Sequence, residues 1–261
     1  MAASPITLER KGRIAVVRFD LGDGKNALSR HIMRELTVIA RSFEDDVETS
    51  AVVLTGAAQV FTLGFDLREA SHADLGLAER RQRQALGARL CRAWEALEPM
   101  TFCAIEGWCV GGGVARMAAL DLRIAGDGAH FYVPDIERGM NMSWQSVPRL
   151  VALMGPARTK RLTVMAERID AARALAWGLV DEVVPASTAF DAAMAMAERV
   201  ASLPPVQVRM CKEGVNLAST AFHHAVSATD RDQYLLAAQS EDYREGVRAF
   251  MGKRKPRYTG R

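Results

Sequence analysis

The sequence predicts an α/β protein in which strands alternate with helices and a helical region follows. Short β-branched segments bounded by glycine or aspartate alternate with segments whose apolar residues recur every three or four positions. Strand-like segments end at Val184, and every later segment has helical periodicity. The 261 residues are 49% hydrophobic and 25% charged, which is typical of a globular chain with a sizeable core.

Four segments have the composition of buried strands. They cover residues 13–19, 51–55, 102–105 and 122–125. Between the first two, Ser29 is suited to cap a helix whose apolar residues are Ile32, Leu36, Ile39, Ala40 and Phe43. A helix over residues 112–119 would connect the last two strands. Strands that alternate with helices in this way favour an α/β fold.

The remaining helices are longer. One is predicted over residues 73–98, with the polar stretch 79–83 as its solvated face. The others are predicted over 190–202, 206–217, 221–238 and 241–251. Pro204 and Pro205 mark a boundary, so we expect a core over residues 1–200 and a C-terminal helical region over 201–261.

Composition excludes several classes of function. A net charge of +3 is too small to predict nucleic-acid binding. No apolar run is long enough for a membrane span, and the first 13 residues do not resemble a signal peptide. The chain is therefore expected to be cytoplasmic, with reduced, buried thiols at Cys91, Cys103, Cys109 and Cys211. The five histidines are scattered, so no metal site is expected.

Two glycine-containing turns are the candidate functional segments. The first is FTLGFDL at residues 61–67, and the second is EGWCVGGGV at residues 106–114. Consecutive glycines between a strand and a helix allow a ligand to approach the backbone, whose free N–H groups can face a developing negative charge. A triple-glycine turn taken alone is equally compatible with tight packing of a helix on a sheet.

Both turns occur with further motifs in a fixed order. The motifs are KNALS (25–29), VVLTG (52–56), AIEGWCVGGG (104–113), DLRIA (121–125), FYVPD (131–135), GPA (155–157), AARALAWGLVDEVV (171–184) and EGVRAFMGKRKPRY (245–258). Together they resemble the crotonase superfamily, also called the enoyl-CoA hydratase/isomerase superfamily, over about residues 6–258.

The resemblance implies a ββα spiral core and a C-terminal helical region that forms trimers, alone or stacked into hexamers. It also implies an acyl-CoA thioester substrate, which carries its own CoA, so no separate cofactor is expected. The backbone N–H groups of Phe65 and Gly112 would form an oxyanion hole for the thioester carbonyl. The residues expected to contact the substrate are Lys25, Ala27, Leu28, Gly64 and Gly111, with Phe250 and Lys253 reaching the CoA of a neighbouring subunit.

The catalytic carboxylates differ from those of the hydratases that the chain resembles. Those enzymes use two glutamates, whereas the corresponding residues here are Ala115 and Asp135. Asp135 is the candidate acid/base, with a pKa raised by burial beside an acyl group. Alternatively, it caps a helix or pairs with Arg138. Glu137 could be a second carboxylate if this segment is extended, although surface exposure is favoured.

Nearby polar residues have simpler interpretations. Ser143 is interpreted as a cap for the following helix, and its presence disfavours the dienoyl-isomerase and dehalogenase chemistries of relatives with a carboxylate there. Asp66 is expected to orient its own loop. His72 falls in the region that lines the acyl pocket in relatives, but we expect it to be solvent-exposed.

The leading hypothesis is therefore an enoyl-CoA hydratase or isomerase with the lone carboxylate of Asp135. Two alternatives stay open. One is a different reaction on an acyl-CoA, such as hydrolysis or decarboxylation. The other is a degenerate relative that binds CoA or RNA, motivated by Ala115 and by the five basic residues among the last nine. That basic end lacks interleaved aromatic residues, so nucleic acid is not the expected partner.

Overall fold

The computed structural model describes residues 4–70 and 75–261, and it contains two sheets. The larger sheet has the strand order β1-β2-β3-β5-β7-β10. Only β1 and β2 pair antiparallel within it, and the other neighbours are parallel. Its strands are β1 (Ile6–Lys11), β2 (Ile14–Phe19), β3 (Ala51–Thr55), β5 (Met100–Ile105), β7 (Leu122–Gly126) and β10 (Glu182–Val184).

The smaller sheet has the order β4-β6-β8-β9. Its strands are β4 (Val60–Thr62), β6 (Trp108–Val110), β8 (His130–Tyr132) and β9 (Ile169–Asp170). Strands β3, β5 and β7 of the larger sheet are followed in the chain by β4, β6 and β8 of the smaller sheet. At least one helix then precedes the next strand of the larger sheet. This repetition is the ββα spiral, and the predicted fold class is confirmed.

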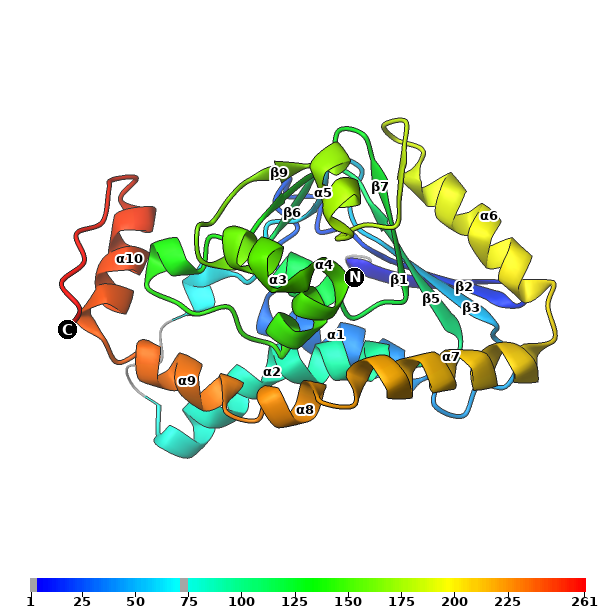
Figure 1. Ribbon diagram of the computed structural model, residues 1–261, viewed down its shortest axis with the longest axis horizontal. Helices are drawn as coiled ribbons and strands as arrows, with labels where there is room; N and C mark the ends of the chain where they lie inside the picture. Colours follow the sequence, from blue (N-terminus) through cyan, green and yellow to red (C-terminus); the bar gives the residue numbers. More distant parts are fainter. Residues whose placement is uncertain (1–3, 71–74) are drawn as a thin grey trace.

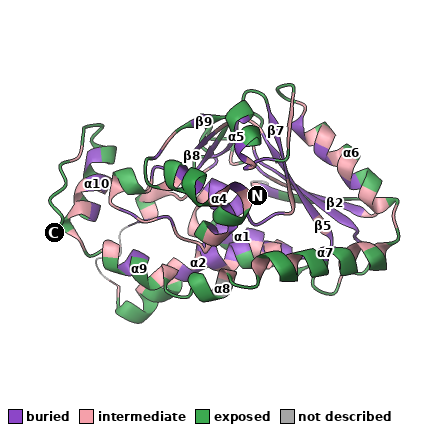
Figure 2. Cartoon of the chain, in the orientation of Figure 1, coloured by how far each residue is buried: buried purple, intermediate pink, exposed green. Residues whose placement is uncertain are grey.

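Helices cover both faces of the larger sheet (Figure 1). The main core lies under α1 (Arg30–Arg41), α2 (Leu77–Glu95) and α3 (Gly112–Met117). On the opposite face, α6 (Ala189–Ala201) packs its alanines against Val53, Phe102 and Ile124. The strands between these layers are buried on both sides (Figure 2), which explains their continuous apolar sequences.

Two helices complete the core region, α4 (Ser146–Thr163) and α5 (Ala171–Trp177). The chain then continues through α7 (Pro205–Thr220), α8 (His223–Val226), α9 (Asp230–Ala237) and α10 (Glu241–Met251). The first three of these run one after another along the molecule, and α10 lies at its end (Figure 1). Much of α7 is exposed, including Met210, Val215 and Leu217.

Several expected elements need correction. The helix predicted over 221–238 is two helices, interrupted at Ser227, whose hydroxyl donates a hydrogen bond to the His223 carbonyl oxygen. The helix predicted over 73–98 is α2, and residues 73 and 74 lie outside the described residues. The predicted cap is confirmed, because Ser29 Oγ accepts a hydrogen bond from the Ile32 N–H at 3.2 Å.

Strand β1 escapes prediction from sequence because it is an edge strand with five exposed residues out of six. Three cysteines are buried as free thiols, whereas Cys211 is exposed on α7, contrary to expectation. Among the described residues, no helix combines the length and the apolar character that crossing a membrane requires.

Candidate active site

The two glycine turns meet where the parallel strands β4 and β6 end. Gly64 has φ +84°, and a Cβ atom there would lie 3.2 Å from the Gly112 nitrogen and 2.5 Å from the Val110 carbonyl oxygen. A side chain at residue 64 would therefore separate the turns. Residue 64 must be glycine because of both this close approach and its positive φ. As a result, the backbone of Phe65 lies beside the first turn of α3.

The backbone N–H groups of Phe65 and Gly112 are among those in these turns that have no hydrogen-bond acceptor in the described residues. The neighbouring Gly111 N–H is used internally, donating to the Tyr132 carbonyl oxygen at 2.8 Å. Free N–H groups at the start of a helix are suited to bind an oxygen that carries negative charge.

The segment over residues 25–28 runs alongside the first turn. The Leu28 N–H donates to the Gly64 carbonyl oxygen at 2.8 Å, and the Leu63 N–H donates to that of Lys25 at 3.0 Å. Asn26 holds this arrangement together with its buried side-chain amide, which donates to the carbonyl oxygens of Phe19 and Phe61. Sequence reasoning missed this role of Asn26. Its backbone has a positive φ of 50°, which is visible only in the structure. The side chain of Lys25 is exposed.

Asp135 lies beside the second turn. Its Oδ2 is 3.3 Å from the position that a Cβ on Gly111 would take. No side chain among the described residues hydrogen-bonds to its carboxyl group. Burial therefore dominates and raises the pKa of Asp135 to about 6, with the positive charge of Arg138 opposing this shift. Arg138 lies over the Phe250 ring and acts on Asp135 through its charge, without a contact between the two side chains close enough for an ion pair.

The segment that carries Asp135 packs against α10. A Cβ on Gly139 would come within 2.6 Å of the Asp242 carbonyl oxygen, and one on Gly246 within 2.4 Å of the Arg138 carbonyl carbon. Two glycines thus let the backbones of α10 and the 3₁₀ turn Ile136–Arg138 pack closely. The Tyr258 hydroxyl adds a hydrogen bond of 2.6 Å to the carbonyl oxygen of residue 137.

The expectations about neighbouring polar residues have different outcomes. The favoured surface exposure of Glu137 is confirmed; its backbone is a 3₁₀ turn and not an extended strand, and its exposed side chain accepts a hydrogen bond from the Tyr132 hydroxyl. Ser143 does not cap α4 through its side chain, since residue 145 occupies the cap position. Asp66, as predicted, orients its loop by accepting a hydrogen bond from the Arg68 N–H. His72 lies outside the described residues.

These turns and Asp135 line one small cavity of about 50 Å³. Ala115 is also in its wall, at the place where the resembled hydratases carry a second carboxylate. Trp144, in a loop, is also a wall residue, and the wall residues that sequence reasoning missed include Tyr234 on α9 and Arg83 on α2. Tyr234 could not be found from spacing, because only the fold brings α9 to this cavity.

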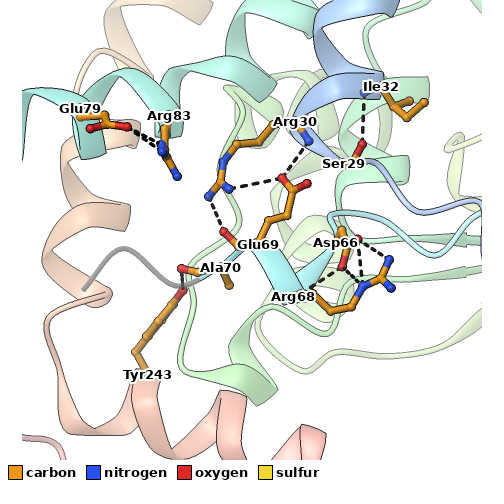
Figure 3. A network of polar contacts seen from close by, with 10 residues as sticks. All are labelled: Ser29, Arg30, Ile32, Asp66, Arg68, Glu69, Ala70, Glu79, Arg83 and Tyr243. Atoms are coloured by element: carbon orange, nitrogen blue, oxygen red, sulfur yellow. Dashed lines mark hydrogen bonds and ion pairs between the residues drawn. The ribbon is translucent and has the colours of Figure 1, made fainter. Parts of the chain in front are cut away.

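Arg30 and Arg83 line this cavity, and Figure 3 shows the polar contacts that they make. Arg30 on α1 forms an ion pair with Glu69 at 3.3 Å, and its guanidinium lies 5.9 Å from the Phe65 ring centre. Arg83 pairs with Glu79 at 2.6 Å along α2. Since both arginines are paired, this wall is built from neutralised ion pairs.

The residues expected to reach CoA from a neighbouring subunit lie at the end of α10. The Phe250 ring is 4.1 Å from the Arg138 guanidinium of the same chain, and Lys253 follows in a left-handed conformation. Phe250 is 48% exposed, so its free face is available to a ligand. Its contact with CoA stays a prediction.

Comparison with known proteins agrees with this geometry. The family model described as enoyl-CoA hydratase/isomerase matches residues 9–261. A probable enoyl-CoA hydratase of Mycobacterium tuberculosis is 32% identical over the full length of both chains. A short-chain-enoyl-CoA hydratase of Clostridium acetobutylicum is 30% identical, covering 98% of this chain and 97% of that protein.

Solved structures show the same fold. The crystal structure of a carnitinyl-CoA hydratase from Mycobacterium avium superposes with a TM-score of 0.87, at 29% identity, and covers 100% of both chains. The family match spans nearly the whole chain and includes both glycine turns. The chain therefore belongs to the enoyl-CoA hydratase/isomerase family and is an enzyme of that type.

Proposed function

We propose that this enzyme isomerises or hydrates an enoyl-CoA thioester through an enolate, with Asp135 as the only carboxylate that transfers protons. The observation that carries the proposal is the position of Asp135. Its carboxyl group lines the same cavity as the unbonded N–H groups of Phe65 and Gly112.

The two N–H groups would bind the thioester oxygen. Removing a proton next to a thioester carbonyl moves negative charge onto that oxygen. Fixed donors stabilise the charged transition state more than the neutral substrate, which lowers the barrier. Loss of one such donor typically costs about 10²–10³ in rate.

Asp135 would be the base and then the acid. With a pKa of about 6, its carboxyl group is mostly ionised at pH 7 and can accept a proton, yet it is basic enough to do so efficiently. In isomerisation, it takes the proton from C2 of a 3-enoyl thioester and returns it to C4, so one carboxylate is sufficient.

Hydration makes a greater demand on a single carboxylate. Asp135 would take a proton from water as the hydroxyl adds to C3, and the same proton would then pass to C2. The resembled hydratases divide these tasks between two glutamates, and Ala115 cannot supply the second. Isomerisation is therefore the reaction that the site supports best, with neither a metal nor a separate cofactor assigned to it.

The test compares two substrates and two variants. Wild-type protein should form conjugated thioester, seen as an increase in ultraviolet absorbance, from the four-carbon substrate 3-butenoyl-CoA. The absorbance of crotonyl-CoA should decrease more slowly. Asp135→Asn should lower the isomerisation rate by about 10²–10⁴, the usual contribution of a positioned acid/base. Glu137→Gln, which alters an exposed carboxylate two residues away, should have little effect.

Two results would contradict the proposal. If Asp135→Asn kept the wild-type rate, another group would transfer the proton. If the wild-type protein acted on neither substrate but bound butyryl-CoA, the alternatives of a different acyl-CoA reaction or of a CoA-binding relative would replace it.

A further inference from the structure

The Trp144 side chain fills the space beside the two unbonded N–H groups. A Cβ on Gly112 would come within 2.5 Å of the six-membered ring of the indole. A Cβ on Gly87 would come within 2.0–2.2 Å of three other indole atoms, Cε2, Cδ2 and Nε1. The ring thus contacts both α2 and α3, and each helix has a glycine where the indole lies.

The loop holds this tryptophan in a defined place. Trp144 and Gln145 both have left-handed backbones, with φ of 64° and 57°, which is unfavourable for residues other than glycine. The Asp230 carboxylate, at the start of α9, accepts a hydrogen bond of 2.8 Å from the Gln145 N–H. Arg149 donates to the Trp144 and Gln145 carbonyl oxygens, at 3.3 and 2.8 Å, and is itself fixed by Glu95.

These contacts all involve the loop backbone, so the side chain at residue 144 can change without breaking them. What the indole determines is the space that is left. The cavity of about 50 Å³ has room for about four water-sized groups, at 10–15 Å³ for each. An unbranched chain longer than about four carbons would collide with the ring.

We infer that Trp144 determines the specificity of this enzyme and restricts its substrates to CoA thioesters of short acyl groups. The inference rests on the proposed acyl-CoA substrate and extends it to a class of acyl group. The thioester oxygen would lie at the N–H groups of Phe65 and Gly112, and the end of the acyl chain would meet the indole.

The experiment measures binding of saturated acyl-CoAs, which can be neither isomerised nor hydrated. Isothermal titration with acetyl-, butyryl-, hexanoyl- and octanoyl-CoA gives the affinity as a function of chain length. For the wild type, affinity should increase up to butyryl-CoA and then decrease by at least about tenfold at octanoyl-CoA, since misfit in an apolar pocket costs about tenfold or more.

Removal of the indole should reverse this preference. In Trp144→Ala, the ratio of octanoyl-CoA to acetyl-CoA affinity should increase by at least about tenfold. Trp144→Gly should give the same change and fold more readily, because glycine tolerates the left-handed backbone. Trp108→Ala, which alters a partly exposed tryptophan on β6, is the matched control and should keep the wild-type ratio.

The outcomes separate the inference from the proposed function. Folded Trp144 variants that keep the wild-type ratio, or a wild type that binds octanoyl-CoA as tightly as butyryl-CoA, would overturn the role of Trp144. A wild type with the expected binding profile but no turnover of enoyl-CoAs would overturn the proposed reaction alone. A wild type that binds no acyl-CoA would overturn both.

Discussion

Replacing Arg116 by methionine should stabilise this protein, although the arginine side chain lies in the middle of the core. Arg116 follows the glycine turn on α3 and is fully buried. None of its three guanidinium nitrogens has a hydrogen-bond partner among the described residues. The guanidinium lies 4.0 Å from the centre of the Trp94 ring, which is a favourable cation–π contact.

The size of the effect follows from two opposing contributions. Burial lowers the pKa of Arg116 from its ordinary value to about 10, which corresponds to a cost of about 3 kcal/mol for the buried charge. The cation–π contact with Trp94 offsets about 2 kcal/mol of this cost when it is desolvated. Methionine keeps much of the packing volume without the charge, so Arg116→Met should increase the free energy of unfolding by about 1–2 kcal/mol.

The assay is urea unfolding followed by circular dichroism, with Arg149→Met as the matched control. Arg149 is equally buried but forms two hydrogen bonds of 2.7 Å to Glu95, so its loss should destabilise the fold by about 3–5 kcal/mol. The gain from Arg116→Met should be constant from pH 5 to pH 9, because the guanidinium is charged in both the folded and the unfolded state throughout that range. If Arg116→Met destabilised the protein as strongly as Arg149→Met, the reasoning would be refuted and the guanidinium would have an anionic partner.

Three further predictions concern the site and the assembly. The isomerisation rate should decrease as the pH falls below about 6, because protonation removes the basic form of Asp135; a rate profile that is flat down to pH 5 would exclude Asp135 as the base. Gly246→Val should lower the rate and loosen the Asp135 segment, since a Cβ there meets the Arg138 backbone at 2.4 Å; hydrogen exchange of residues 135–140 should increase, whereas Gly214→Val, at an open position on α7, should leave it unchanged. The exposed apolar residues of α7 should be covered in a trimer, so light scattering should give three times the 28.5 kDa chain mass, and a monomer would contradict this prediction.

Much of the fold could be predicted because its central strands are buried on both faces. Such strands are continuous apolar runs, and the segments at 51–55 and 102–105 were identifiable for that reason. Strand β1 and the two- and three-residue strands of the smaller sheet could not be predicted. An edge strand carries exposed charges, and a three-residue strand is too short for a period to be visible.

The site divides in the same way between local and long-range information. The glycine turns and Asp135 could be predicted from the sequence as candidate site residues because each belongs to a local motif. The conformation of the Asp135 segment was not, since an extended chain and a 3₁₀ turn fit the same residues and only packing against α10 selects the turn. Ser143 was misinterpreted as a cap for a related reason: the left-handed Trp144 and Gln145 displace the helix start to Ser146.

The sequence by itself determined the family through its motifs, the ββα spiral that the resemblance implies, and the two glycine turns, because these turns need backbone conformations and close approaches that only glycine allows. Tertiary structure alone decided what surrounds those groups. The position of the indole between Gly87 and Gly112, the approach of Tyr234 and the unpaired charge of Arg116 all arise from contacts between residues far apart in the chain. The physical reason is that a local motif fixes the backbone, whereas the volume and the charge of a cavity are set by every element that packs around it.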